Sequence, residues 1–294
     1  MKGPTGNTTV SELLVALCLM AAFFSAAAPA QKAAPPRQLT FGFLPIVSTE
    51  RLVRRFGPLV DYLSRSLGRS VRMETAPDFE TFLRRTQHER RYDLLFTAPH
   101  FYYLARRQAG YRALVRVDRP GMRAVIVAPR TGPLRTLADL RGRRLATVDP
   151  LALATMLVRA RLEEAGLDPD RDLVLVSTPS HNASLLSALQ GQAEAASLML
   201  PLFEQAAPEL RASMRVLAKT GVSPHMPISV APWVQPELAT RIRKLLLGLK
   251  DSPEGRLLLE HLNWPGFTTV APGTYDGLAW AAPALDTSPG DKAP

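Results

Sequence analysis

The chain has 294 residues, with 36 lysines and arginines against 26 acidic residues and a formal net charge of +10 at neutral pH. Its one cysteine, Cys18, lies within the first thirty residues, so we expect no disulfide or thiolate chemistry in the rest of the chain. The arginines are spread along the sequence instead of forming one tract, which fits either a solvated basic surface or a preference for anionic partners.

The first thirty residues have the order of a secretory signal peptide. Lys2 precedes an apolar run that begins at Leu13, and small residues close on Ala30, where we expect cleavage. A membrane anchor is the alternative, but the run is shorter than the roughly 20 apolar residues that a spanning helix needs. We therefore expect a periplasmic protein that does not bind nucleic acid. Residues 31–37 then form a Pro/Ala linker.

Strand and helix patterns alternate from Leu39 onward. The stretch from Leu39 to Leu44 reads as a short buried strand, and apolar residues at helical spacing follow Ser48-Thr49 and end at Gly68. The next expected elements are a strand at 71–75, a helix at 79–87, a strand at 92–96 and a helix at 98–108. Strands that alternate with helices predict a doubly wound, mainly parallel sheet.

An extended segment at 125–128 leads to a turn-rich break at 129–133, and a second α/β series follows the break. Its expected elements are helices at 137–140, 152–165 and 182–190, and strands at 144–147 and 173–177. An extended segment at 228–231 and helices at 236–249 and 253–262 complete the chain. These two series predict two lobes, residues 38–127 with 227–280 and residues 128–226, followed by a disordered tail at 281–294. The ligand is then expected in the cleft between the lobes, which closes by a hinge motion.

Polar residues gather at four of the expected strand-to-helix turns. Free backbone N–H groups and the positive end of the helix dipole make each turn a potential anion site, although Ser, Thr and Asn there are also ordinary helix caps. His181 heads a helix and can donate to an anion, whereas His100 can either line the cleft or pack beneath it. The candidate ligand-binding residues are Ser48, Thr49, Thr97, His100, Tyr102, Thr155, Ser180, His181 and Asn182.

The sequence contains no recognisable catalytic motif. It lacks G-x-S-x-G, H-E-x-x-H and the P-loop pattern, so we do not expect an enzyme. His225, Met226 and Met199 lack a defined ligand spacing, and we expect neither a metal nor a cofactor.

Several stretches between residues 39 and 276 share one family pattern. They are FGFLPIVSTERLVRRFGPLVDYLSRSLG, YDLLFTAPHFYYLA, LADLRGRRLATVDP, TPSHNASLLSALQGQAEAA, DSPEGRLLLEHL and GFTTV with the later YD. In these stretches the chain resembles the periplasmic phosphate/phosphite/phosphonate-binding proteins of ABC importers. The resemblance implies a two-lobed periplasmic binding protein of type II, and it places Tyr102 and His181 at ligand-contacting positions.

One segment departs from that family pattern. After the Asp-Pro pair, transporters of phosphonates carry a Ser-Thr-Ser cluster, whereas Asp149-Pro150 is followed here by Leu151-Ala152-Leu153-Ala154-Thr155. The backbone amides remain but most hydroxyls are missing, so tight phosphonate binding is not carried over. We predict a monomer that binds a small oxyanion, phosphate, phosphite or phosphonate-like, and delivers it to an inner-membrane ABC permease. A sensory protein that presents its solute to a membrane receptor or sensor kinase is the alternative, and an enzyme acting on phosphonate esters is the third hypothesis.

Overall fold

The structure is a computed structural model that describes Met1 and residues 37–285. Residues 2–36 and 286–294 lie outside the described residues. They include the expected signal peptide after Met1, the linker up to Pro36 and the last nine residues of the expected tail. Within the described part of the chain, no helix has both the length and the apolar character that crossing a bilayer requires.

The first lobe is built on a sheet with the strand order β11-β4-β10-β3-β1-β2. β1 pairs in parallel with β2 and β3, whereas β10 runs antiparallel to both β3 and β4. The strands are β1 (Leu39–Phe43), β2 (Val71–Glu74), β3 (Leu94–Phe96), β4 (Arg112–Val117), β10 (Pro227–Val230) and β11 (Phe267–Thr268).

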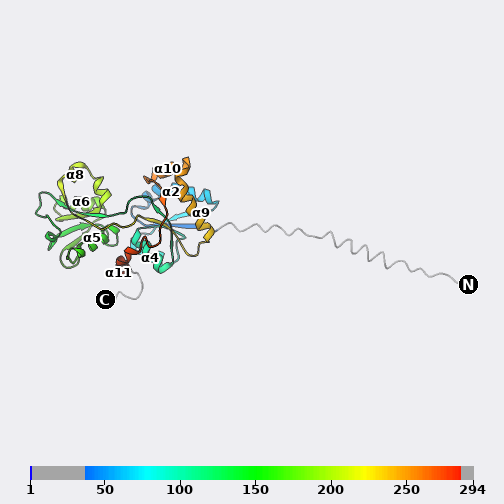
Figure 1. Cartoon of the computed structure of the whole chain (residues 1–294), viewed down its shortest axis with the longest axis horizontal. Helices are drawn as coiled ribbons and strands as arrows, with labels where there is room; N and C mark the ends of the chain where they lie inside the picture. Colours follow the sequence, from blue (N-terminus) through cyan, green and yellow to red (C-terminus); the bar gives the residue numbers. More distant parts are fainter. Residues whose placement is uncertain (2–36, 286–294) are drawn as a thin grey trace. The chain divides into compact units, whose positions relative to one another are not determined.

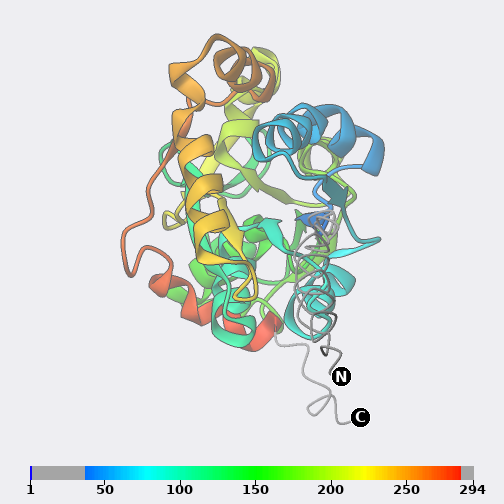
Figure 2. The same cartoon turned by 90° about the vertical axis from the view of Figure 1, so that its right-hand side faces the viewer.

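The helices of the first lobe come from both ends of the described chain. They are α2 (Thr49–Leu67), α3 (Phe79–Gln87), α4 (Pro99–Ala109), α9 (Pro236–Leu247), α10 (Pro253–Leu262) and α11 (Ala282–Leu285), with 3-10 turns η3 (Gly248–Asp251) and η4 (Asp276–Ala281). α9 and α10 contact α2, and the C-terminal η4 and α11 contact α4, as Figures 1 and 2 show. The first lobe is therefore built from two chain segments, one before and one after the second lobe.

The second lobe is built on a sheet with the order β7-β6-β8-β5-β9. β6 pairs in parallel with β7 and β8, and β5 is antiparallel to β8 and β9. Its strands are β5 (Ala124–Pro129), β6 (Arg144–Thr147), β7 (Val174–Ser177), β8 (Ala195–Met199) and β9 (Met214–Lys219). Its helices are η2 (Ala138–Leu140), α5 (Leu153–Glu164), α6 (His181–Leu189), α7 (Leu200–Glu204) and α8 (Pro208–Ser213).

Local sequence explains α2 well. The side chains that it buries are Leu52, Phe56, Leu59, Val60, Leu63 and Leu67, one face at helical spacing. Gly68 ends the helix with φ of 61°, a left-handed conformation that favours glycine because it has no Cβ. Phe56 packs against the rings of Phe43, Phe96 and Trp264, so the face of α2 seals an aromatic core beneath β1 and β3.

The predicted two-lobed α/β fold is confirmed, with three differences in detail. Each sheet is mixed. β10, which follows the second lobe in the sequence, runs antiparallel to β3 in the first sheet, and β5, the first strand of the second sheet, runs antiparallel to β8. All of β5 pairs within the second sheet, so the expected lobe boundary at residue 127 lies too late, and residues 124–127 belong to the second lobe. The expected disordered tail also begins too early, because Ala281 and Leu285 are 0% and 1% exposed in a helical segment packed on α4.

Candidate functional site

The polar turns of the two lobes meet at one contact. β1 and β3 are parallel neighbours, so the turns that lead into α2 and α4 leave the same edge of the first sheet. β6 and β7 are also parallel neighbours, which brings the starts of α5 and α6 to one edge of the second sheet. A hydrogen bond of 2.9 Å between His100 Nε2 and the Leu151 carbonyl joins these two edges.

Apolar side chains support the same contact between the lobes. Leu151 packs against the hydrophobic core of the first lobe, and Met156, from the first half of α5, is 5% exposed and belongs to that core. Leu151 and Met156 flank the stretch Ala152-Leu153-Ala154, which stands in place of the hydroxyl cluster that the resemblance led us to expect. The segment after Asp149-Pro150 thus joins the lobes through apolar packing and a backbone carbonyl.

The start of α4 holds two buried polar atoms that lack partners. Thr97 and His100 are each 1% exposed. Neither Thr97 Oγ1 nor His100 Nδ1 has a hydrogen-bond partner among the described residues. Ala98 is the N-cap residue, so no side chain caps α4. Buried polar atoms are almost always paired in folded proteins, which makes this helix start a good candidate for contact with a solute or an ordered water.

The protonation state of His100 follows from its surroundings. The Leu151 carbonyl can only accept a hydrogen bond, so Nε2 is the donor. Burial lowers the pKa of His100 to about 4, and the bond to Leu151 opposes this only in part. At neutral pH the ring is therefore uncharged, with its proton on Nε2 and a lone pair on Nδ1.

Tyr102, the position that the resemblance placed at the ligand, lies in the core of the first lobe. Its hydroxyl accepts a hydrogen bond of 2.9 Å from the Ala113 N–H, and its ring meets Tyr275 edge-on at 4.8 Å. Burial raises the pKa of the phenol. The geometry thus commits Tyr102 to packing beneath the turn and does not support its assignment as a ligand contact.

Ser48 and Thr49 begin α2 and are both exposed. Ser48 is the N-cap residue, but its hydroxyl makes no capping hydrogen bond to the helix. Its carbonyl accepts from the Leu52 N–H, as in any first helical turn. The first amides of α2 therefore have no side-chain cap and are available to an anion.

Thr155 is engaged inside the second lobe. Its Oγ1 lies 2.7 Å from Thr147 Oγ1 and donates to the Val148 carbonyl at 3.2 Å, at 1% exposure. The turn before it is held by Asp149, whose carboxylate accepts from the Leu151 N–H at 2.8 Å. Thr155 is thus a structural residue, and the start of α5 offers a solute little beyond its backbone.

The start of α6 combines an ordinary helix cap with a half-buried histidine. Ser180 accepts a hydrogen bond of 3.2 Å from the Ala183 N–H, which makes it a helix cap. Asn182 is exposed. His181 Nδ1 is buried and has no partner within the described segments, and burial lowers the pKa of its ring. Of the residues predicted at this turn, His181 remains the best placed to contact a solute.

Two features of the structure could not be identified from residue types. The partner of His100 is a backbone carbonyl, and a leucine at position 151 carries no sequence signal for that role. A group of cations also gathers at the end of α10, where Arg119 donates to the Asn263 carbonyl and Arg55 to the Leu262 carbonyl. The negative end of a helix dipole favours cations there. In the sequence these arginines look like scattered surface charge.

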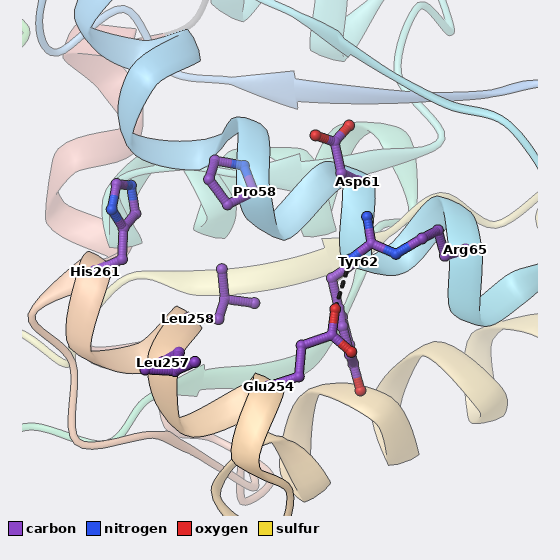
Figure 3. Close-up of a pocket in the computed structure, with 8 residues that line it drawn as sticks. All are labelled: Pro58, Asp61, Tyr62, Arg65, Glu254, Leu257, Leu258 and His261. Atoms are coloured by element: carbon purple, nitrogen blue, oxygen red, sulfur yellow. Dashed lines mark hydrogen bonds and ion pairs between the residues drawn. The ribbon is translucent and has the colours of Figure 1, made fainter.

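A groove of about 400 Å³ lies elsewhere on the first lobe, between α2 and α10. Figure 3 shows the side chains of the two helices on its facing walls, with the Arg65–Glu254 ion pair across it. Its lining residues are Pro58, Asp61, Tyr62, Arg65, Glu254, Leu257, Leu258 and His261. None of the predicted ligand residues lines this groove, so we do not assign it as the solute site.

Comparisons with known proteins agree with this architecture. A family model described as "ABC transporter, phosphonate, periplasmic substrate-binding protein" matches residues 41–275. PhnD1 from Prochlorococcus marinus, solved with methylphosphonate, is 16% identical, with a TM-score of 0.72 over 85% of this chain and 98% of that chain. A Xanthomonas citri protein solved with chloride is 18% identical, with a TM-score of 0.73 over 84% and 98% of the two chains.

A third solved structure is a binding protein component of an ABC phosphonate transporter from Pseudomonas aeruginosa. It is 17% identical, with a TM-score of 0.68 over 86% of this chain and 90% of that chain. At such identities the likeness establishes the fold, which is that of a type II periplasmic binding protein.

Proposed function

Because the chain belongs to the periplasmic substrate-binding proteins of phosphonate-type ABC transporters, we propose that it binds a small oxyanion between its lobes and delivers it to a membrane permease. The observation that carries the proposal is a pair of buried atoms at the start of α4, Thr97 Oγ1 and His100 Nδ1, that have no partner among residues 37–285, at the helix that makes the contact between the lobes. The family function is binding, and nothing in the described site supplies a nucleophile paired with a base.

The site would hold an anion with neutral groups. The Thr97 hydroxyl donates, and the uncapped N-terminal amides of α2 and α4 add oriented N–H groups with the positive end of the helix dipole. His181 contributes a further polar atom from the second lobe. Closure of the lobes then buries the solute, and the closed form is what the permease recognises.

Isothermal titration of the periplasmic protein with phosphate, phosphite and methylphosphonate tests this function. We expect at least one of these anions to bind, and the substitution Thr97→Val to weaken that binding at least about tenfold, since one hydrogen bond to a charged group is worth roughly 1.5–3 kcal/mol. The matched control is Thr86→Val, because Thr86 is a buried threonine of the same lobe whose hydroxyl bonds the Phe82 carbonyl. A folded protein that gives no heat with any of the three anions would contradict the proposal.

Export and assembly state are part of the proposal. We place the mature protein in the periplasm as a monomer that begins at Gln31, the residue after the expected cleavage site. Cell fractionation and N-terminal sequencing test the first point, and light scattering tests the second. A full-length chain that stays in the membrane fraction would favour the anchor alternative.

A further inference from the structure

We infer that His100 makes this site selective for oxyanions that carry a proton, because its Nδ1 atom can only accept a hydrogen bond. The inference rests on the proposed function and specifies which protonation state of the solute binds. A solute that carries a hydroxyl on its head group can donate to Nδ1, whereas a fully deprotonated anion places an acceptor against an acceptor.

The contact between the lobes fixes the tautomer. Nε2 lies 2.9 Å from the Leu151 carbonyl oxygen, and a carbonyl has no proton to give. Nε2 must therefore carry the proton, and the uncharged ring leaves only a lone pair on Nδ1. His100 is thus oriented by a residue of the opposite lobe. Its Nδ1 atom is therefore held as a hydrogen-bond acceptor for the solute when the two lobes are in contact.

Nδ1 is also deprived of solvent and of protein partners. His100 is 1% exposed, and Nδ1 has no hydrogen-bond partner in the described portion of the chain. The charged groups of neighbouring elements, Glu80 of α3, Arg106 of α4, Asp149 before α5 and Asp276 of η4, are not among the causes of its shifted pKa. Burial lowers the pKa of the ring to about 4 and the Leu151 carbonyl opposes this only in part, so the ring is neutral at and above pH 6.

The Thr97 hydroxyl, in the turn just before α4, can supply the complementary donor. Thr97 Oγ1 can donate to a charged oxygen of the solute while His100 Nδ1 accepts from a protonated one. A hydrogen phosphonate or hydrogen phosphate anion has both kinds of oxygen, and a sulfonate or sulfate at neutral pH has only the first. Sites with a committed acceptor for a substrate hydroxyl reject analogues without it strongly, because the acceptor is left buried and unpaired.

Methylphosphonate and methanesulfonate provide a direct test, since both have a tetrahedral head and a methyl group. Titration calorimetry between pH 6 and pH 9 compares them on the same protein. We expect methanesulfonate to bind at least about 100-fold more weakly than methylphosphonate at pH 6. Methylphosphonate affinity should fall about tenfold per pH unit once the pH exceeds its second ionisation. The ring of His100 does not titrate in this window, so the fall reports the proton on the solute.

The variant His100→Gln separates the acceptor from the contact between lobes. Its amide can still donate to the Leu151 carbonyl from the former Nε2 position, but nothing remains at Nδ1. We expect the discrimination between the two anions to shrink at least tenfold and the pH dependence to flatten. His261→Gln is the matched control, because His261 Nε2 also bonds a backbone carbonyl, that of Arg54, on the surface of the same lobe.

The outcomes distinguish this inference from the proposed function. Methylphosphonate binding that does not change with pH, or equal binding of methanesulfonate, would overturn the inference and leave an oxyanion-binding protein. An ordered water bound to Nδ1 would also overturn the inference, since methylphosphonate affinity of the native protein would then not change with pH. If neither these two anions nor phosphate and phosphite bind at any pH, the proposed function fails and the inference fails with it.

Discussion

Thr155 Oγ1 lies 2.7 Å from Thr147 Oγ1, and this buried pair ties the first turn of α5 to the end of β6. We predict that Thr155→Val lowers the free energy of unfolding by about 2 kcal/mol, because it leaves the Thr147 hydroxyl and the Val148 carbonyl without this partner. Solute affinity should change less than twofold. Urea unfolding followed by circular dichroism measures the first effect and calorimetry the second. A large loss of affinity at unchanged stability would instead make Thr155 a ligand contact.

The case of Thr155 shows how far residue patterns reach at this site. A threonine in the first turn of a helix has the same sequence signature whether its hydroxyl faces a solute, as predicted, or the neighbouring strand, as found. The same ambiguity affects Ser180, which caps α6, and Tyr102, which packs in the core. Which way such side chains turn depends on strand pairing and on distant residues such as Ala113, and a local pattern does not contain this information.

The fold is more predictable than the site, because the helices depend on local sequence patterns more than on long-range contacts. The sequence predicts α2, α3 and α10 nearly to the residue, because their apolar spacing and end signals are local. It does not predict β4, β8 and β9, since these strands depend on long-range partners more than on a distinctive local pattern. The composition after Ala282 predicts a disordered tail, because Pro, Ser, Gly and Asp are frequent there, whereas Ala282 and Leu285 of α11 pack against the core of the first lobe.

Gly42, in the middle of β1, has no room for a side chain. A Cβ atom there would lie 2.6 Å from the ring of Tyr92, which is itself fully buried. We predict that Gly42→Ala lowers the free energy of unfolding by about 1–3 kcal/mol, the usual effect of overpacking a core. Thermal unfolding of the ligand-free protein measures the change.

Gly57 is the matched control for that substitution. It lies inside α2, and a Cβ atom there would meet nothing within 4 Å. Gly57→Ala should therefore stabilise the protein by about 0.5–1 kcal/mol, since alanine favours the helix. Equal effects of the two substitutions would show that the contact with Tyr92 is not what limits residue 42.

Asp93 connects three segments of the first lobe. One carboxylate oxygen accepts from the Thr40 N–H at 2.8 Å, and the other accepts from Trp233 Nε1 at 2.9 Å. We predict that Trp233→Phe lowers the free energy of unfolding by about 2 kcal/mol, because it removes a hydrogen bond to a buried charged group. Trp280→Phe is the control, since Trp280 is 40% exposed and should tolerate the change. Similar losses in both variants would mean that ring size, and not the bond to Asp93, accounts for the effect.

Two buried histidines should make the protein sensitive to mild acid. Burial lowers the pKa of His100 to about 4, and burial together with Arg119 and Arg116 lowers that of His225 to about 4 as well, against 6.5 in an unfolded chain. Between these values the unfolded chain binds protons that the folded chain does not. Stability is thus fully present above about pH 6.5 and is lost as the pH falls toward 4, by about 1.4 kcal/mol per pH unit for each histidine.

Urea unfolding at pH 7.5 and pH 5.0 measures this loss. His225→Gln should reduce it by about 2 kcal/mol, because its share over roughly 1.5 pH units is removed. His225 Nδ1 accepts from the Met226 N–H at 2.9 Å, and protonation of that nitrogen would break the bond, which gives the low pKa a structural basis. His261→Gln serves as the control at an exposed histidine. If a variant lacking both His100 and His225 loses as much stability between the two pH values as the native chain, the acid sensitivity has another source.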